Sequence, residues 1–561
     1  MIFGYNYLYF RKKLKNHQFR FALFSLIIFG FSFLNAQKQK AKTSEVWVSD
    51  LSNGTYKNPV LYADYSDPDV IRVGEDFYMT ASSFNETPGL PILHSKDMIN
   101  WKLVNHAITD LVPKDHYSVP QRGNGVWAPS IRFHKGEFYI YWGDPDFGIF
   151  MVKTKDPWGK WDEPILVMEG KGLIDSCPFW DEDGNAYIVH GWAGSRAGVK
   201  SILTLNKMNA EGTKVLDKGV HIFDGHDEHK TVEGPKMHKR NGYYYIFAPA
   251  GGVATGWQLV LRSKNIYGPY EEKIVLEQGS TKINGPHQGA WVDSASGEDW
   301  FYHFQDVDTH GRIVHLQPMK WEKDWPKIGE DYDKNGIGEP VSDFRKPVIN
   351  KNLSIETPAE SDEFNDDKIG LQWQWSANEN IIWSAKLPGK DYLRLFSIKI
   401  PDGEKNLWNV PNLLTQKFPA PEFVATTKVK LFPEDAKEGK IAGLLVMGTD
   451  HQSLVITNKP DGYYLQLRRA KNAEKGGEEK VLSEIKLKGN EAYLKVLVNE
   501  PNGICTFSYS ENGQKFEKIG EPFQATPGKW IGAKVGLYSV SEGKSPRGGY
   551  ADFDFFRITK K

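Results

Sequence analysis

Residues 62–83 read Tyr-Ala-Asp-Tyr-Ser-Asp-Pro-Asp-Val-Ile-Arg-Val-Gly-Glu-Asp-Phe-Tyr-Met-Thr-Ala-Ser-Ser, an acidic turn that leads through a glycine into a short apolar strand. Three aspartates, Asp64, Asp67 and Asp69, stand close together, and Pro68 biases the backbone of Asp67 toward the extended region. Alone, the stretch is typical of a turn rich in Asp and Pro. Acidic side chains just before a strand can also face a ligand from a rigid scaffold, so recurrence of the pattern distinguishes the two interpretations.

Five glycine-led segments with aromatic strand starts recur at intervals of roughly 50–60 residues, in the range of propeller blades. Each is typical of a hairpin turn that leads into a β-strand. The segments are Gly74-Glu-Asp-Phe-Tyr-Met79, Gly136-Glu-Phe-Tyr-Ile-Tyr-Trp142, Gly184-Asn-Ala-Tyr-Ile-Val-His190, Gly242-Tyr-Tyr-Tyr-Ile-Phe247 and Gly297-Glu-Asp-Trp-Phe-Tyr-His303.

A second signature, a polar turn followed by aromatic residues, lies inside three of these units. Helical periodicity is nearly absent, so the predicted fold class is all-β. Five units predict a five-bladed β-propeller over residues 37–348, with inner strands that converge on a central channel. The signature occurs as Ser95-Lys-Asp97 before Trp101, Thr154-Lys-Asp156 before Trp158 and Trp161, and Ser263-Lys-Asn265 before Tyr267 and Tyr270.

The C-terminal part has a different sequence pattern. Residues 349–361 are polar and contain Pro358, which is typical of a linker. Beyond them, short alternating strands separated by polar turns predict a β-sandwich domain of residues 362–561. The strands that stand out are Phe423–Leu431, Ile441–Met447, Tyr493–Val498 and Tyr550–Ile558.

Length and composition exclude some classes of protein. At 561 residues the chain is too long for one ordinary core, and a formal net charge of −1 argues against a general binder of nucleic acid or anionic membranes. Aromatic residues make up 13% of the chain, and exposed rings suit stacking on the apolar faces of sugars. The only cysteines, Cys177 and Cys505, are expected to be free buried thiols in different domains, with no metal-binding cluster.

Residues 1–36 have the order of a secretory signal peptide. Five basic residues within 11–20 precede an apolar run at 21–34, and Ala36 offers a small residue for cleavage. The run is short for a membrane span, which needs roughly 20 apolar residues. An uncleaved anchor is the alternative. We expect an exported protein, periplasmic or secreted.

Three isolated carboxylates, Asp67, Asp175 and Glu233, stand near predicted blade starts. Each is flanked by small or apolar residues and proline, and desolvation in such surroundings raises a carboxyl pKa. If the inner strands bring them to one channel, they supply the protonated acid and the ionised base that hydrolysis of a glycosidic bond requires. A third carboxylate can tune the pKa of the acid by like-charge proximity. Each one alone is equally consistent with a turn cap.

Six short motifs occur in order: Ser66-Asp67-Pro68, Val126-Trp-Ala-Pro129, Ile174-Asp175, Glu233-Gly-Pro235, Gly285-Pro-His287 and Gly311-Arg312. Together they resemble glycoside hydrolase family 43, which implies a five-bladed propeller that hydrolyses pentose glycosides with inversion. The C-terminal part is similar to the concanavalin-like β-sandwich of the β-xylosidase/α-L-arabinofuranosidase branch. That similarity rests on Ser361-Asp-Glu-Phe364, Gly370-Leu-Gln-Trp-Gln-Trp375 and Gly549-Tyr-Ala-Asp-Phe-Asp-Phe555.

The resemblance implies a role for each carboxylate. Asp67 would be the general base that activates water, Glu233 the general acid, and Asp175 the residue that orients Glu233 and raises its pKa. Two departures from the family pattern matter. Asp69 follows Pro68 and is a second candidate for the base, and Cys177 stands two residues after Asp175.

The resemblance also implies residues that bind the sugar. Phe84 and Trp127 match aromatic positions of the sugar subsite, and Arg312 matches an arginine that contacts the sugar or the acidic cluster. His287 matches a histidine under the active site beside a water-coordinated calcium ion. No metal ligand is assigned and no cofactor is required; a calcium ion near His287, or a structural one in the sandwich, stays open. The oxygen donors for a structural ion would be Asp362, Glu363 and Asp552.

The preferred hypothesis is an inverting exo-glycosidase that removes terminal α-L-arabinofuranosyl or β-D-xylosyl residues from hemicellulose-derived saccharides. The partner is then an oligo- or polysaccharide, with no nucleic acid and no membrane-spanning partner. The loop at 541–549 is a candidate to narrow the pocket, with a surface hairpin as the alternative. A fructan hydrolase would carry Asn-Asp-Pro-Asn and Arg-Asp-Pro stretches, which this chain lacks. A carbohydrate-binding propeller without catalysis is the remaining alternative.

Overall fold

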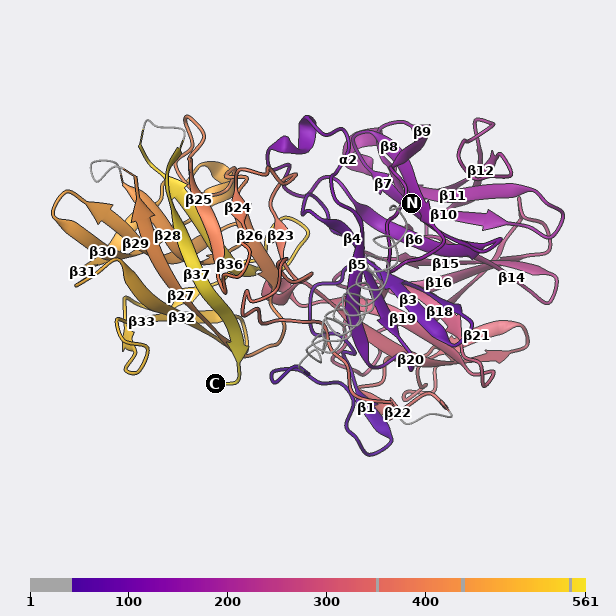
Figure 1. The fold of residues 1–561 in the computed structure, drawn as a ribbon. Helices are drawn as coiled ribbons and strands as arrows, with labels where there is room; N and C mark the ends of the chain where they lie inside the picture. Colours follow the sequence, from indigo (N-terminus) through magenta and orange to yellow (C-terminus); the bar gives the residue numbers. More distant parts are fainter. Residues whose placement is uncertain (1–42, 350–352, 435–438, 544–546) are drawn as a thin grey trace, which may run out of the picture. The chain divides into compact units, whose positions relative to one another are not determined.

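The computed structural model describes residues 43–349, 353–434, 439–543 and 547–561, so the predicted signal peptide lies outside the described residues. Five four-stranded antiparallel sheets form five blades, and a β-sandwich follows (Figure 1). The predicted all-β class, the five-bladed propeller and the sandwich are therefore confirmed. Within the described part of the chain, no helix is long and apolar enough to cross a membrane.

Each blade takes four consecutive strands, which pair in chain order. The blades are β2 (Asp69–Val73), β3 (Asp76–Thr80), β4 (Gly89–Ser95) and β5 (Trp101–Ile108); β6 (Trp127–His134), β7 (Glu137–Asp144), β8 (Gly148–Thr154) and β9 (Ile165–Glu169); β10 (Leu173–Trp180), β11 (Ala186–Trp192), β12 (Ile202–Met208) and β13 (Val220–Asp224); β14 (Lys236–Arg240), β15 (Tyr243–Ala250), β16 (Trp257–Ser263) and β17 (Glu271–Leu276); and β18 (His287–Asp293), β19 (Asp299–Asp306), β20 (Arg312–Glu322) and β21 (Trp325–Ile328).

The recurring glycines lie in the hairpin turn between the first and second strand of every blade. All five have positive φ, from +64° at Gly74 to +85° at Gly184, a conformation that glycine adopts without a steric penalty. The second signature lies between the third and fourth strands. Asp97, Asp156 and Asn265 each accept a hydrogen bond from the backbone N–H two residues later, at 3.0 Å. These Asx turns explain why the polar signature recurs.

Five apolar clusters lie between neighbouring blades, one at each of the five blade–blade contacts. One of them joins the fifth blade to the first, with Val292 and Tyr302 packed against Val70 and Met79, all nearly fully buried. Strand β1 (Thr55–Lys57) pairs with β22 (Asp343–Arg345), which ties the start of the domain to its end. The ring is thus closed by apolar packing and holds the inner strands in fixed positions around the channel.

The sandwich is one hydrogen-bonded network of strands, with a large apolar core and a second, smaller apolar cluster among its described residues. Strand β27 alternates buried and partly exposed residues, the period of two expected for a half-buried strand. The strands are β23 (Gln374–Trp375), β24 (Ser384–Ala385), β25 (Leu393–Lys399), β26 (Leu413–Lys417), β27 (Phe423–Pro433), β28 (Lys440–Met447), β29 (His451–Lys459), β30 (Gly462–Ala470), β31 (Lys480–Lys486), β32 (Glu491–Asn499), β33 (Ile504–Ser510), β34 (Glu517–Lys518), β35 (Phe523–Gln524), β36 (Lys534–Ser541) and β37 (Arg547–Thr559).

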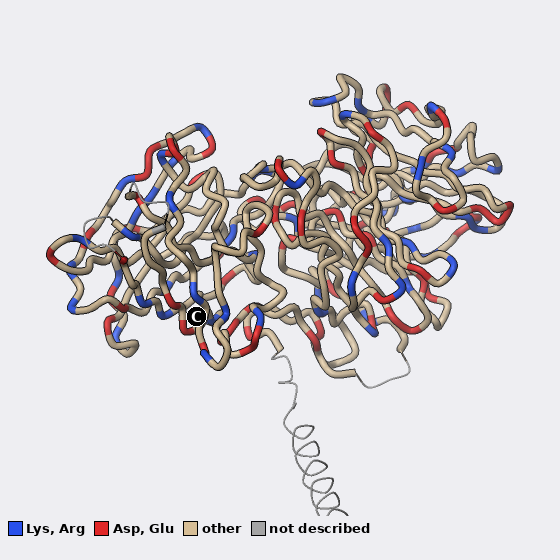
Figure 2. Tube along the Cα trace, turned by 45° about the horizontal axis from the view of Figure 1, so that its top comes forward, with Lys and Arg blue, Asp and Glu red and all other residues tan. Residues whose placement is uncertain are grey.

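Helical structure in the described residues is limited to single turns, which are α2 (Gly194–Ala197), η1 (His116–Ser118), η2 (Asp308–His310) and η3 (Ala473–Lys475). Basic and acidic residues alternate along the chain in Figure 2, with no extended run of one sign in this view. This mixture agrees with the formal net charge of −1.

Candidate active site

In each blade, a residue with left-handed backbone stands near the beginning of the innermost strand. These residues are Asp67 (φ +55°), Ala128 (+34°), Asp175 (+59°), Gly234 (+58°) and Gln288 (+37°). A non-glycine residue in this region costs about 1–3 kcal/mol, and such strain clusters at functional sites. The extended backbone expected for Asp67 is therefore wrong: Pro68 mainly disfavours the right-handed helical region, and hydroxyl contacts to the Asp67 side chain hold the left-handed conformer.

One pocket gathers six of the seven predicted site residues. The seventh, His287, is fully buried and lies with its Nε2 atom 3.5 Å from Glu233 Oε1. The three carboxylates come from three different blades, as the repeat predicted. The pocket is lined by Asp67, Phe84, Trp127, Ala128, Ile174, Asp175, Glu233, Val253, Gln288, Arg312 and Trp530.

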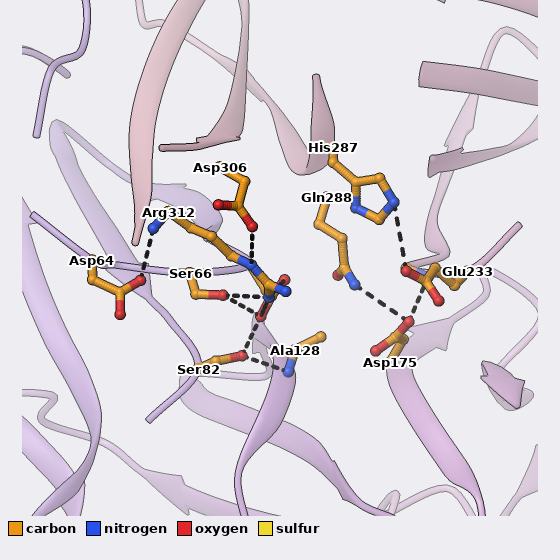
Figure 3. Close-up of polar contacts among 12 residues, drawn as sticks. Asp64, Ser66, Ser82, Ala128, Asp175, Glu233, His287, Gln288, Asp306 and Arg312 are labelled. Atoms are coloured by element: carbon orange, nitrogen blue, oxygen red, sulfur yellow. Dashed lines mark hydrogen bonds and ion pairs between the residues drawn. The ribbon is translucent and has the colours of Figure 1, made fainter. Parts of the chain in front are cut away.

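The Asp67 carboxylate is held by hydroxyls and by an arginine. Its partners Ser66, Ser82 and Arg312 are labelled in Figure 3. Its Oδ2 atom accepts hydrogen bonds from Ser66 Oγ at 2.7 Å and from Ser82 Oγ at 2.5 Å. Arg312 Nη1 lies 3.4 Å from Asp67 Oδ1 and donates to Ser66 Oγ at 2.9 Å. Ser82 Oγ also accepts the backbone N–H of Ala128 at 2.7 Å, which connects the first blade to the second. These contacts orient the Asp67 carboxylate, which lines the pocket and can accept a further hydrogen bond there.

Asp69, the alternative base, does not line this pocket. It is 1% exposed and forms an ion pair with Arg132, with Nη1 2.6 Å from Oδ2, while the same oxygen accepts the N–H of Ile131 at 2.8 Å. Arg132 also donates a hydrogen bond to Cys177 Sγ at 2.9 Å. The unusual cysteine therefore helps to hold the arginine that pairs with Asp69. Both cysteines are free and buried, as predicted.

Asp175 lies in a bulge of β10, where the register with β11 shifts between Ile174 and Cys177. Its Oδ2 atom accepts the N–H of Gly234 at 2.8 Å and Gln288 Nε2 at 3.4 Å. Burial, and then the negative charge of Asp67, raise the pKa of Asp175 to about 6. Asp175 is therefore mostly ionised at neutral pH and places a fixed negative charge beside Glu233.

The pKa of Glu233 is raised more strongly than that of Asp175. Burial, followed by the charges of Asp175 and Asp67, raises the pKa of Glu233 to about 8. Burial lowers the pKa of His287 to about 3, so this neighbour is neutral and adds no positive charge that would ionise Glu233. A carboxyl that keeps its proton at neutral pH is what a general acid requires.

Removal of the Asp175 charge is expected to shift the pH profile. In Asp175→Asn the pKa of Glu233 falls because one of the charges that raises it is lost. Glu233 then loses its proton at lower pH, so the basic limb of the pH profile of kcat/KM moves to lower pH. The maximal value of kcat/KM also drops. Asp181→Asn, at the far end of β10 where Asp181 pairs with Lys239, is the matched control and should leave the limb in place. An unmoved basic limb in Asp175→Asn would contradict the coupling.

The walls of the pocket are aromatic. Phe84 and Trp127 pack edge to face with ring centroids 6.3 Å apart, and Trp127 packs against Trp530 in the same way at 6.0 Å. Trp530 belongs to the sandwich domain and is 50% exposed, with a φ of +67°. The sandwich thus contributes one wall of a propeller pocket.

The loop that narrows the pocket differs from the one proposed from sequence. Residues 544–546 of the 541–549 loop lie outside the described residues, and the described part of that loop does not line the pocket. The contribution comes from residues 525–533 instead, where Gly528 and Gly532 flank Trp530. A tryptophan between two nearby glycines was the signal available in the sequence.

Gln288 and Ser82 are the other residues that sequence reasoning missed. Gln288 contacts Asp175, and its Oε1 atom is buried without a partner in the described structure. Gly234 makes room for it, because a Cβ at position 234 would lie 2.9 Å from Gln288 Cδ. For Gln288 the available signal was its position directly after His287 in a motif already recognised.

The three oxygen donors suggested for a structural calcium are engaged separately. Asp362 accepts backbone N–H groups of Phe364 and Gly370. Glu363 pairs with Arg557, and Asp552 pairs with Arg394. They do not form the oxygen cage that calcium needs, so this suggested donor set is not supported.

One cluster of potential metal ligands occurs among the described residues, formed by Glu228, His229 and Glu272. His229 Nδ1 accepts a hydrogen bond from Trp257 Nε1 at 3.3 Å, which leaves the proton of a neutral ring on Nε2, facing Glu272 Oε1 at 3.4 Å. A nitrogen that carries a proton cannot ligate a metal, so in this tautomer His229 is in close contact with Glu272 and is not available as a ligand.

Comparison with known proteins identifies the family. Residues 56–326 match glycosyl hydrolases family 43, and residues 361–559 match the β-xylosidase C-terminal concanavalin A-like domain. A protein of Xylanibacter ruminicola named "Putative beta-xylosidase" is 40% identical, over 88% of this chain and 87% of its own length. A β-xylosidase of Formosa agariphila is 32% identical, over 92% and 93%.

More distant relatives also match about nine tenths of this chain. The GH43 protein BlXynB from Bacillus licheniformis superposes with a TM-score of 0.77 at 26% identity, over 90% of this chain and all of that one. The non-reducing end α-L-arabinofuranosidase BoGH43B of Bacteroides ovatus is 27% identical, over 91% and 96%. The chain therefore belongs to glycosyl hydrolase family 43 and is a glycoside hydrolase of its β-xylosidase/α-L-arabinofuranosidase group.

Proposed function

We propose that the protein removes single terminal pentose residues from hemicellulose-derived saccharides, with inversion of configuration and with β-D-xylosides as the preferred substrates. The observation that carries the proposal is the pocket in which Asp67, Asp175 and Glu233 meet between aromatic walls. The preference for xylose is supported by two relatives that are 40% and 32% identical over about nine tenths of this chain, both of which carry β-xylosidase names. Arabinofuranosides are the second candidate, because a more distant relative acts on them.

In the proposed mechanism, Glu233 donates its proton to the glycosidic oxygen as the bond to the leaving group breaks. Asp67, oriented by Ser66, Ser82 and Arg312, takes a proton from the water that attacks the opposite face of the sugar. Asp175 stays ionised and keeps the pKa of Glu233 high. The hydrogen bonds from the two serine hydroxyls hold the Asp67 carboxylate in one orientation. An inverting enzyme requires this, because its water must attack from one defined side of the sugar.

The position of Trp530 in the pocket wall supports an exo mode of action. The Trp530 ring packs against Trp127 in the wall of the pocket, and in this proposal the two rings block a saccharide chain from continuing past the bound sugar. A pocket of this kind accepts the end of a chain and not its middle. The aromatic faces of Phe84, Trp127 and Trp530 suit the apolar faces of a pentose ring.

The experiment that tests the function compares an aryl β-D-xylopyranoside with an aryl α-L-arabinofuranoside, with the anomer of the released sugar followed by NMR. Release of xylose as the inverted α-anomer is the expected result. Faster release of arabinose would reverse the proposed preference, and initial release of the retained anomer would overturn the mechanism. Activity on neither, with the fold intact by circular dichroism, would revive the hypothesis of a carbohydrate-binding propeller without catalysis.

Export and calcium remain part of the proposal. The signal-like residues 1–36 support export, and fractionation of cells that express the full chain tests it. Around His287 the described side chains offer an imidazole and Glu233, which is not the set of six to eight oxygens that calcium prefers. Any ion there would be held largely by water, so no catalytic step is assigned to it.

A further inference from the structure

Asp64 lies three residues before Asp67, outside the pocket lining, and is 3% exposed. Its Oδ1 atom accepts the backbone N–H of Arg312 at 2.9 Å, and its Oδ2 atom accepts the backbone N–H of Gly532, also at 2.9 Å. The first of these contacts is visible at the left of Figure 3. One carboxylate therefore joins the propeller strand that carries Arg312 to the sandwich loop that carries Trp530.

The two backbones that Asp64 joins lie in direct contact. A Cβ at Gly532 would lie 2.6 Å from the backbone nitrogen of Gly311, and a Cβ at Gly311 would lie 2.5 Å from Asp64 Cγ. Gly311 also has a φ of +72°. Next to this contact, Ala533 donates its N–H to the carbonyl oxygen of Thr309 at 2.7 Å. The approach is possible only because both junction residues are glycines.

The loop on the sandwich side needs this support. Trp530 is a bulky residue with positive φ, a conformation that persists only when its surroundings impose it. Its ring meets Trp127, and the guanidinium of Arg312 lies 6.0 Å from the ring centroid. A shift of the Gly532 backbone would move Trp530, and with it the wall of the pocket.

We propose that Asp64 is a positioning residue that clamps the Trp530 loop (residues 525–533) against Arg312 and so sets the width of the sugar pocket. This role rests on the pentosidase function proposed above. The carboxylate is suited to it because two acceptor oxygens meet two N–H donors from different domains. The amide of asparagine offers one acceptor only, and its NH₂ group would face the second N–H.

The test is a double-mutant cycle in the full-length protein with Asp64→Asn and Trp530→Ala. Asp64→Asn alone is expected to raise KM for an aryl β-D-xyloside about tenfold, the size expected for loss of a hydrogen bond to a charged group, with a smaller change in kcat. In the Trp530→Ala background the same substitution should change KM by less than about twofold, because its effect is transmitted through Trp530. If the increase in KM of the double variant equals the product of the increases in the two single variants, the proposal is overturned.

A control separates this role from a general loss of stability. Asp50→Asn removes another buried carboxylate of the propeller, which pairs with Lys346 and lies away from the pocket. It should lower the melting temperature and leave KM unchanged. If Asp64→Asn does not fold, Thr309→Val replaces it, since Thr309 Oγ1 donates to the carbonyl of Ala525 at the base of the same loop. It should raise KM in the same Trp530-dependent way, and an unchanged KM would count against the clamp.

A readout that does not need activity distinguishes failure of this inference from failure of the proposed function. In Asp64→Asn, peptides that cover residues 528–533 should exchange amide hydrogen faster than in the wild type and in Asp50→Asn. Unchanged exchange there would overturn the clamp even in an active enzyme. An inactive wild type with faster exchange in Asp64→Asn would reject the pentosidase and keep the clamp.

Discussion

Asp67→Asn is expected to lose about 10²–10⁴-fold in kcat on every glycoside, whatever its leaving group, because attack by water needs the base in all cases. The fold should survive, since asparagine keeps one acceptor for the hydroxyls of Ser66 and Ser82 that hold the side chain. The measurement is kcat on xylobiose and on a dinitrophenyl xyloside. Added azide, a nucleophile that requires no deprotonation, should restore part of the turnover.

Asp69→Asn is the matched control for this experiment. It leaves Arg132 without its buried partner, so it should lower the melting temperature, and the hydrolytic rate of the folded protein should remain. The opposite pattern, with Asp67→Asn active and Asp69→Asn inactive although folded, would transfer the role of base to Asp69.

Glu233→Gln is expected to separate substrates by their leaving groups. With xylobiose, whose leaving oxygen needs a proton, kcat/KM should fall about 10²–10⁴-fold. With a dinitrophenyl xyloside, whose leaving group departs as an anion, most of the activity should remain. The basic limb of the pH profile should also disappear, because the carboxyl whose pKa is raised to about 8 is gone.

Glu228→Gln is the control for Glu233, since it removes an exposed carboxylate from the same connection between β13 and β14. Its kinetics should match the wild type on both substrates. Equal losses of Glu233→Gln on xylobiose and on the activated substrate would argue that Glu233 binds the sugar rather than donating a proton.

The repeat could be predicted from sequence because its signals are local. Gly74 supplies the positive φ of its own turn, and Asp97 accepts a hydrogen bond within its own turn. Because such effects reach only a few residues, the same short pattern recurs in the sequence of several blades. The acids could be named for a related reason. Their flanking small and proline residues predicted desolvation, and the raised pKa values of Asp175 and Glu233 agree with it.

What only the tertiary structure decided are the contacts that assemble the site. Ser82 reaches Asp67 across 15 positions, Gln288 reaches Asp175 across 113, and Gly532 reaches Asp64 across 468. Such pairs join different strands, blades or domains, so no periodicity along the chain records them. The sequence by itself determined five blades, a sandwich and three acids, because neighbouring residues encode turns and strands. The orientation of the base and the Trp530 wall depend on how separate parts of the chain pack, and only the folded molecule specifies that packing.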